Sequence, residues 1–276
     1  MIKTGEFTIG GGNPLVLIAG PCVVESRELV LQTAERLTKI TRRYKVPLIF
    51  KSSYKKANRT SGKSFSGIKI DLALQILREV HRELGLPVLT DIHSEYEAQI
   101  VAGIADIIQI PAFLCRQTDI LCAAGRTGKV VNIKKGQFMA PEDMKLQAEK
   151  VTATGNKKVM LTERGASFGY HNLVVDMRSL VIMKGFGFPV VLDATHSVQL
   201  PGGGKGVTGG QPEFIFPIAR AGVAVGIDAL FIETHPDPKR ALSDSQSQLP
   251  LDRVDQLLKE IISIDKIVKE NIEKKR

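Results

Sequence analysis

The amino-acid sequence predicts an α/β protein, folded as a (β/α)₈ TIM barrel with a short N-terminal hairpin, and three observations support this prediction. Short apolar runs rich in β-branched residues recur along the chain, and most are followed by a segment with helical periodicity. Eight such runs fit within 276 residues, an ordinary length for this barrel. No composition shift or Pro/Ser-rich linker divides the chain, so we expect one barrel domain over residues 1–276. A doubly wound open sheet is the alternative architecture.

The expected elements follow one another regularly. The leading segment, Ile2 to Gly12, alternates weakly around several glycines and predicts a hairpin that closes the floor of the barrel. Apolar residues recur at helical spacing from Leu72 to Leu84, after the second strand, and from Val254 to Val268 in the final helix. The expected strands begin near Leu15, Pro47, Pro87, Asp106, Lys129, Lys157, Pro189 and Asp228.

Composition limits the class of protein. Hydrophobic residues make up 43% of the chain, but no apolar stretch is long enough to span a bilayer and the first residues carry no signal-peptide core. We therefore expect a cytoplasmic protein with no membrane partner. The three cysteines, Cys22, Cys115 and Cys122, form no CxxC pair, which argues against a disulfide framework and a zinc ribbon.

The formal charge of +9 suits nucleic acid, a membrane surface or phosphorylated metabolites. The basic residues are scattered among the expected loops, and the longest terminal cluster is the short Lys274–Arg276 tail. Four tyrosines and no tryptophan leave few platforms on which bases could stack. A small phosphorylated substrate is therefore favoured, and a non-catalytic nucleic-acid-binding protein is kept as an alternative.

Polar residues stand at the ends of the expected strands, where barrels carry their active sites. Two carboxylates, an amide, two imidazoles and three cations stand there: Lys51, Asp91 with His93, Gln109, Lys134, Arg164, His196 and Glu233, in strand order from the second to the eighth. Lys51, Lys134 and Arg164 at one mouth would form an anion site, because arginine offers a bidentate fork and lysine a point charge.

Four of the residues near strand ends are good ligands for a divalent transition metal. Cys22 follows the first strand, His196 the seventh and Glu233 the eighth, and Asp244 lies in the next loop. A thiolate, an imidazole and two carboxylates suit one Fe²⁺, Zn²⁺ or Mn²⁺ ion. His235 is an alternative nitrogen ligand to His196.

The most glycine-dense part of the chain runs from Leu200 to Gly210 and follows the seventh strand directly. Composition leaves two interpretations open for this loop: a mobile lid over the mouth of the barrel, or an ordinary flexible surface loop.

Several motifs then identify a resemblance that covers nearly the whole chain. They are Ala19–Ser26 (AGPCVVES), Phe50–Ser53 (FKSS), Lys56–Ser61 (KANRTS), Gln109–Leu114 (QIPAFL), Arg116–Asp119 (RQTD), Asn132–Phe138 (NIKKGQF), Glu163–Tyr170 (ERGASFGY), Asp193–His196 (DATH) and Glu233–Pro236 (ETHP). Together they resemble the 3-deoxy-D-manno-octulosonate 8-phosphate synthase family.

The resemblance implies condensation of phosphoenolpyruvate with arabinose 5-phosphate and water, on a barrel that usually assembles as a homotetramer. By resemblance, Lys51, Gln109, Lys134 and Arg164 hold phosphoenolpyruvate, and Lys51, Lys134, Arg164 and His196 are the expected catalytic residues. The loop after the second strand would receive the pentose phosphate through Lys56, Asn58, Arg59 and Ser61. Arg116 is similar to a family residue near the subunit interface.

Two features distinguish this chain from the metal-independent branch of the family and from a related synthase. Metal-dependent members of the family carry cysteine where Cys22 stands and metal-independent members carry asparagine, so the resemblance implies the metal-dependent branch. The related 3-deoxy-7-phosphoheptulonate synthase, which uses erythrose 4-phosphate, typically has Lys-Pro-Arg-Thr where this chain has Lys56-Ala57-Asn58-Arg59-Thr60. The pentose enzyme is therefore favoured over this alternative.

Overall fold

A computed structural model describes residues 1–58, 62, 64–167, 171–202 and 209–273 of the protein. Its central strands are all parallel and lie in the order β11 (Val190–Asp193), β8 (Val159–Glu163), β7 (Val130–Lys134), β6 (Ile107–Ile110), β5 (Val88–Asp91), β4 (Leu48–Lys51), β3 (Val16–Gly20) and β14 (Ala229–His235). Strand β11 also pairs with β14, so the sheet closes on itself. The predicted (β/α)₈ barrel is confirmed, and the open-sheet alternative is wrong.

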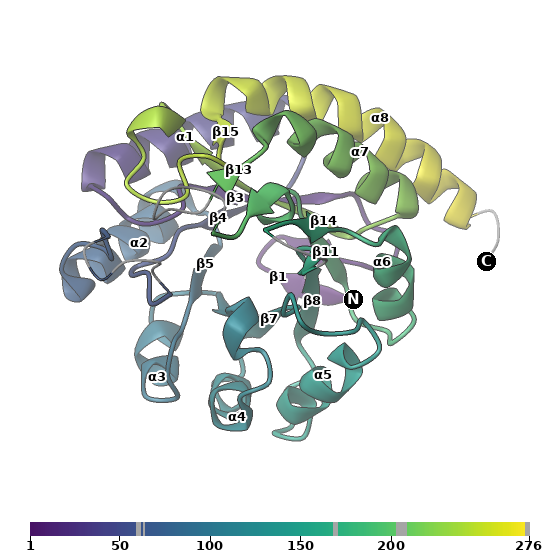
Figure 1. Cartoon of the computed structure of the whole chain (residues 1–276), viewed down its shortest axis with the longest axis horizontal. Coiled ribbons are helices and arrows are strands. Elements are labelled where there is room, and N and C mark those ends of the chain that lie inside the picture. Colours follow the sequence, from purple (N-terminus) through teal and green to yellow (C-terminus); the bar gives the residue numbers. More distant parts are fainter. Residues whose placement is uncertain (59–61, 63, 168–170, 203–208, 274–276) are drawn as a thin grey trace.

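Helices surround the barrel as an outer ring (Figure 1). Ser26 begins the first of them by accepting a hydrogen bond from the backbone N–H of Leu29, as a good N-cap does. The ranges predicted around Leu72–Leu84 and Val254–Val268 match α2 and α8. The ring consists of α1 (Arg27–Tyr44), α2 (Ile70–Leu84), α3 (Glu97–Ala102), α4 (Thr118–Arg126), α5 (Met144–Thr152), α6 (Met177–Lys184), α7 (Ile215–Val225) and α8 (Val254–Glu273).

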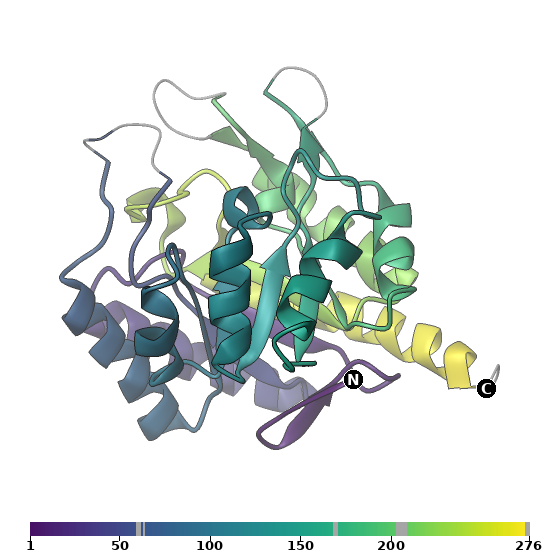
Figure 2. The same cartoon turned by 90° about the horizontal axis from the view of Figure 1, so that it is seen from below.

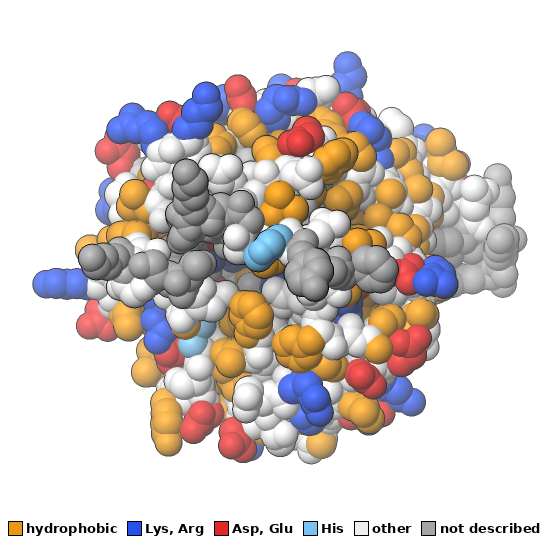
Figure 3. Space-filling view, in the orientation of Figure 1, with side chains coloured by type: hydrophobic (Ala, Val, Ile, Leu, Met, Phe, Trp, Pro, Cys, Tyr) orange, Lys and Arg blue, Asp and Glu red, His pale blue; other side chains and the backbone are white. Residues whose placement is uncertain are grey.

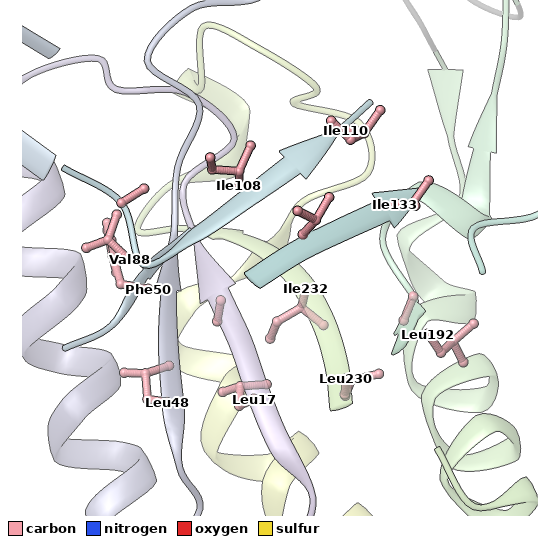
Figure 4. Packing of buried hydrophobic residues seen from close by; sticks show 14 of the residues in the cluster. Leu17, Leu48, Phe50, Val88, Ile108, Ile110, Ile133, Leu192, Leu230 and Ile232 are labelled. Carbon is pink, nitrogen blue, oxygen red and sulfur yellow. The ribbon is translucent and has the colours of Figure 1, made fainter. Parts of the chain in front are cut away.

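Both faces of each barrel strand are buried. Successive side chains of a strand point to opposite sides, so one set faces the surrounding helices and the other faces the inside of the barrel. In β3, Leu17 and Ala19 belong to the apolar layer between sheet and helices, whereas Val16 and Ile18 belong to the layer inside the barrel. Figure 4 shows side chains of the outer layer, such as Leu17 and Leu48 on the neighbouring strands β3 and β4. This two-sided burial explains why the strands appear in the sequence as continuous apolar runs.

The N-terminal hairpin closes one end of the barrel, as predicted. Strands β1 (Ile2–Thr4) and β2 (Phe7–Ile9) pair antiparallel, with Ile2 opposite Ile9. Both isoleucines are buried in the inner apolar layer, together with Val16 and Ile18 of β3. Figure 2 shows the hairpin at the end of the barrel opposite the long connecting loops. The floor is therefore an apolar plug.

The opposite end, where the strands finish, carries the shorter elements. These are β9 (Ala166–Ser167) paired with β10 (Leu173–Val174), β12 (Gln199–Leu200) paired with β13 (Gly209–Gly210), β15 (Leu249–Pro250) beside β14, and the 3₁₀ turns η1 (Ala112–Leu114), η2 (His196–Val198), η3 (Pro212–Phe214), η4 (Pro238–Arg240) and η5 (Leu251–Arg253). Residues 203–208 of the glycine-rich loop, for which a lid and an ordinary surface loop are both open, lie outside the described residues. Within the described residues, no helix is long and apolar enough to cross a membrane.

Candidate active site

The structure gathers most of the predicted site residues around one cavity at the carboxyl ends of the strands. Those that line it are Lys51, Lys56, Asn58, Asp91, His93, Gln109, Lys134, Arg164, His196 and Glu233. Arg116 is exposed between η1 and α4 and is not among the lining residues. Arg59 and Ser61 lie outside the described residues. The residues predicted at the strand ends therefore lie around one cavity, and their roles stay predictions.

The backbone at the end of β3 must pass very close to β4 to build this mouth. Gly20 allows it, since a Cβ at this position would lie 2.1 Å from the carbonyl oxygen of Lys51. Any larger residue would push apart the two strands that carry Cys22 and Lys51. The glycine of the Ala-Gly-Pro-Cys motif is thus explained by packing.

Asp193 organises one side of the cavity. It is the last residue of β11, is fully buried, and forms a short ion pair with Lys134. Its carboxylate lies 2.8 Å from Nδ1 of His196 and accepts the backbone N–H of the same residue at 2.9 Å. Burial alone would raise the pKa of Asp193, but His196 and Lys134 outweigh it and hold the pKa well below its usual range.

Asp193 belongs to the Asp193–His196 motif, but the sequence alone predicts no role for it. An aspartate three residues before His196, at the end of an apolar run, was the available signal. Because Asp193 holds both the amine of Lys134 and the ring of His196, it fixes the relative position of two predicted catalytic groups.

Lys51 and Glu233 form the second buried pair. The amine of Lys51 lies 2.6 Å from Oε1 of Glu233 and also donates to the carbonyl oxygen of Cys22 at 3.1 Å. Burial would raise the pKa of Glu233, but Lys51 and the nearby Lys56 outweigh it and keep the carboxylate ionised. Beneath them, the ring of Phe231 lies 5.5 Å from the Lys51 amine and 4.2 Å from the Lys134 amine. Both lysines are therefore fixed by several partners.

Arg164 differs from these lysines, because part of its guanidinium has no partner in the described part of the chain. It follows β8 and is only 4% exposed. Its Nη2 donates to Oε1 of Gln199 at 2.9 Å, but Nε and Nη1 are buried with no hydrogen-bond partner among the described residues. Buried donors without acceptors are costly, so these atoms mark a place where an anion would be bound.

Glu163 holds the backbone of Arg164 in place. Its Oε1 accepts the backbone N–H groups of Arg164, at 3.0 Å, and of Gly165, at 2.7 Å. Gly165 has a φ of +91°, a conformation that side-chain-bearing residues rarely adopt. The turn after β8 is thus built to direct the guanidinium into the cavity.

Three of the four predicted metal ligands meet beside this cavity. Ligand atoms of Cys22, Glu233 and Asp244 all lie within 4.8 Å of one another, and Sγ of Cys22 is 2.8 Å from Oδ2 of Asp244. His196 falls outside this group, with its Nε2 3.9 Å from Oε1 of Glu233. The alternative ligand His235 accepts a hydrogen bond from the backbone N–H of Asp237 at 3.0 Å and lies outside the group as well.

The chemistry of this cluster fits a divalent cation. Oε2 of Glu233 is buried and has no hydrogen-bond partner among the described residues. Burial first, and then the charges of Asp244 and Glu233, raise the pKa of the Cys22 thiol well above its usual value. A thiol beside two carboxylates is unfavourable as a thiolate unless a cation compensates the charge, and one sulfur with two oxygens is a suitable ligand set for a transition metal.

The far side of the cavity carries a histidine between two carboxylates. Nε2 of His93 lies 2.9 Å from Asp91, and Glu97 lies 3.4 Å from Nδ1. Burial lowers the pKa of His93, but the hydrogen bond to Asp91 and the nearby carboxylate of Glu97 outweigh it and raise the pKa to about 9. Sequence reasoning noticed His93 but missed Glu97, which stands four residues further on.

The outer surface around the mouth mixes charges of both signs. Figure 3 shows lysine and arginine side chains interspersed with aspartate and glutamate around the rim of this face. A continuous basic stripe of the kind that follows a nucleic-acid backbone is not visible on the described part of this face. Part of the positive charge is buried in the cavity, at Lys51, Lys134 and Arg164, where it suits a small anion.

Comparisons with known proteins agree with this geometry. A sequence profile of the DAHP synthetase I family matches residues 1–270. Proteins named 2-dehydro-3-deoxyphosphooctonate aldolase are similar over nearly all of both chains: 57% identity over 268 residues in Geobacter metallireducens (97% of this chain and 98% of the relative), 54% over 272 residues in Syntrophotalea carbinolica (99% and 98%), and 53% over 268 residues in Brucella ovis (97% and 97%). The chain therefore belongs to the DAHP synthetase I family, as a close relative of its 2-dehydro-3-deoxyphosphooctonate aldolases.

Proposed function

We propose that this protein condenses phosphoenolpyruvate with D-arabinose 5-phosphate and water, giving 3-deoxy-D-manno-octulosonate 8-phosphate and inorganic phosphate. The relatives carry the name of an enzyme with this product, at 53–57% identity over nearly their full length. The observation that carries the proposal is the pair of unpartnered guanidinium nitrogens of Arg164, buried in a cavity that also contains Lys51 and Lys134. Such a site is incomplete without an anion.

Phosphoenolpyruvate carries a phosphate and a carboxylate, and we assign both to this cluster. Arg164 would bind one of them through two parallel N–H donors, and the amines of Lys51 and Lys134 would lie within reach of the rest. Gln109 lines the same cavity, and its Oε1 accepts a hydrogen bond from Nδ2 of Asn132 at 3.1 Å. Its NH₂ group, which faces the same cavity in this proposal, would donate to the ligand.

In the reaction, carbon three of phosphoenolpyruvate attacks the aldehyde carbon of the sugar, and water adds at carbon two before phosphate leaves. Negative charge moves onto the aldehyde oxygen and then onto the departing phosphate. Fixed cations stabilise both changes, because their amines are already held by Glu233 and Asp193 and need not reorganise. Lys51, Lys134, Arg164 and His196 are the catalytic residues of this proposal.

The aldose phosphate belongs on the side of the cavity formed by the loop after β4. Lys56 and Asn58 line the cavity there, and Lys56 is only 10% exposed. Arg59 and Ser61, the next residues of the same motif, are assigned to the sugar phosphate from the family resemblance alone. Arg116 is assigned a role near a subunit interface on the same ground.

Cys22, Glu233 and Asp244, with His196 beside them, would hold one divalent ion, which we propose to be Fe²⁺, Zn²⁺ or Mn²⁺. When bound, such an ion supplies Lewis acidity that polarises an aldehyde oxygen or lowers the pKa of a water. Asp193 keeps His196 oriented through Nδ1, so that Nε2 faces Glu233.

We further propose that residues 1–276 form one domain, that the chain assembles as a homotetramer, and that it works in the cytoplasm.

Phosphate release tests the proposal directly. The purified protein should release phosphate from phosphoenolpyruvate rapidly with arabinose 5-phosphate and far more slowly with erythrose 4-phosphate. Mass spectrometry of the product should give an eight-carbon sugar acid phosphate. Equal rates with both sugars would contradict the assignment and favour the heptulonate alternative.

A further inference from the structure

We propose that Glu97, the first residue of α3, is a positioning residue for the aldose-phosphate side of the site, because it fastens the loop after β4 to His93. The inference rests on the proposed function and adds to it a residue that does not line the cavity. It also accounts for a group of contacts that the proposed chemistry does not use.

The carboxylate of Glu97 is a meeting point of three segments. Oε2 accepts the hydroxyl of Tyr54 at 2.5 Å and the backbone N–H of His93 at 2.6 Å. Oε1 accepts the amine of Lys55 at 2.5 Å. Oε2 also lies 3.4 Å from Nδ1 of His93. One side chain on α3 therefore binds the chain just after β4 and the chain just after β5.

The residues that Glu97 binds either precede cavity residues in the chain or line the cavity themselves. Tyr54 and Lys55 lead into Lys56 and Asn58, which line the cavity, and His93 lines it from the other side. The two consecutive lysines diverge: the amine of Lys55 goes to Glu97, and that of Lys56 lies 3.7 Å from Glu233 inside the site. Holding Lys55 on Glu97 thus directs Lys56 inward.

The hydrogen bonds that Glu97 accepts from Tyr54, Lys55 and His93 are strong, although Glu97 itself is only partly buried. Tyr54 is only 1% exposed, and its ring packs edge-on against the ring of His93 at 5.9 Å. Burial would raise the pKa of Glu97, but the hydrogen bonds from His93, Lys55 and Tyr54 outweigh it and hold the pKa well below its usual value. Removing the carboxylate would leave a buried hydroxyl and a backbone N–H without their acceptor.

Glu97 is also one of two carboxylates that keep His93 charged. The imidazole is flanked by Asp91 at 2.9 Å and by Glu97 at 3.4 Å, and together these carboxylates raise its pKa to about 9. His93 is therefore a cation at neutral pH and faces the cavity in which a sugar phosphate would be bound. Without Glu97, one of its two counter-charges is gone.

The test compares Glu97→Ala with Glu95→Ala, which removes an exposed carboxylate two residues earlier. In steady-state kinetics we expect Glu97→Ala to raise the KM for arabinose 5-phosphate about 10-fold, the effect of losing one charge-assisted hydrogen bond, and the KM for phosphoenolpyruvate less than about twofold. Glu97→Gln, which keeps an acceptor but loses the charge, should lie between wild type and alanine. Glu95→Ala should match wild type.

A second measurement separates positioning from general loosening of the fold. Histidine Cε1–H resonances, with that of His93 assigned through His93→Asn, should show the pKa of His93 falling by at least about one unit in Glu97→Ala and Glu97→Gln and not in Glu95→Ala. Glu97→Gln, being isosteric, supplies this result if the alanine variant does not fold. Equal increases of both KM values, or an unchanged His93 titration, would overturn the inference. A wild-type protein inactive on arabinose 5-phosphate would instead overturn the proposed function.

Discussion

The two ends of the barrel are made from the same eight strands but from opposite kinds of side chain. At the floor, the hairpin residues Ile2 and Ile9 pack on Val16 and Val191, all of them apolar and buried. At the mouth, Lys51, Lys134 and Asp193 are just as deeply buried but charged. At the floor, burial of apolar side chains stabilises the fold. At the mouth, burial of charged side chains sets the strength of their electrostatic interactions.

The physical basis is the cost of desolvation. Burying an isoleucine stabilises the fold by roughly 1.5–3 kcal/mol, whereas a buried ion pair often gives no net stability over an apolar pair. The mouth therefore depends on the rest of the barrel to keep its charges in place. Its buried ionic groups are nevertheless suited to a reaction in which two anions must meet. The following predictions break one end of the barrel at a time.

Removal of the divalent ion should give the largest effect. Exhaustive chelation should reduce phosphate release to below about 1% of the untreated rate, and Mn²⁺, Fe²⁺ or Zn²⁺ should restore part of it. Elemental analysis should find about one metal ion per chain. Cys22→Ser should abolish most of the activity and the bound metal, whereas Cys122→Ser, at a thiol outside the cluster, should retain both. Full activity after chelation would place the protein in the metal-independent branch.

Arg164→Ala should come next. Loss of the two unpartnered donors should cost roughly 2 to 5 kcal/mol of transition-state stabilisation, measured as the fall in kcat/KM for phosphoenolpyruvate. The thermal midpoint should not fall, because the variant removes a buried charge that the folded protein only partly satisfies. Arg164→Lys should recover little, since an amine cannot reproduce the fork. A variant with normal catalytic efficiency would remove the arginine from the site.

Ile9→Ala breaks the floor instead. The side chain is completely buried in the inner apolar layer, so its truncation should lower the free energy of unfolding by about 2–4 kcal/mol in urea titrations. Activity per folded molecule should stay the same, because the site lies at the other end. Lys3→Ala, at the exposed position of β1, is the matched control and should change neither quantity. A large loss of kcat in Ile9→Ala would show that the two ends are coupled.

The smallest effect should be the pH dependence of stability from His93. Its pKa is about 9 in the folded protein and close to 6.5 in an unfolded chain, so the folded state binds the extra proton. This contribution is fully present below about pH 6.5 and is lost as the pH rises through 9, a decrease of roughly 3 kcal/mol. Urea titrations at several pH values should show this slope in wild type and not in His93→Gln. An equal slope in both proteins would assign it to another group.

The sequence determined the barrel and the positions of its strand ends. Each strand is buried on both faces, which produces apolar runs that can be recognised without a structure, and the helices between them keep their periodicity because one side must face the sheet. Since parallel strands end at the same side, Lys51, Lys134, Arg164, His196 and Glu233 could be placed at one mouth before any coordinates were known. The motifs then supplied the family.

Only the tertiary structure decided which of these groups face one another. It paired Lys51 with Glu233 and Lys134 with Asp193. Among the described residues, it kept His235 out of the metal cluster and left two donors of Arg164 without a partner. It also brought Glu97 of α3 onto Tyr54 and His93, a contact between separate segments. Such pairings depend on strand register and side-chain direction, which follow from packing over the whole barrel. No local pattern in the sequence encodes them.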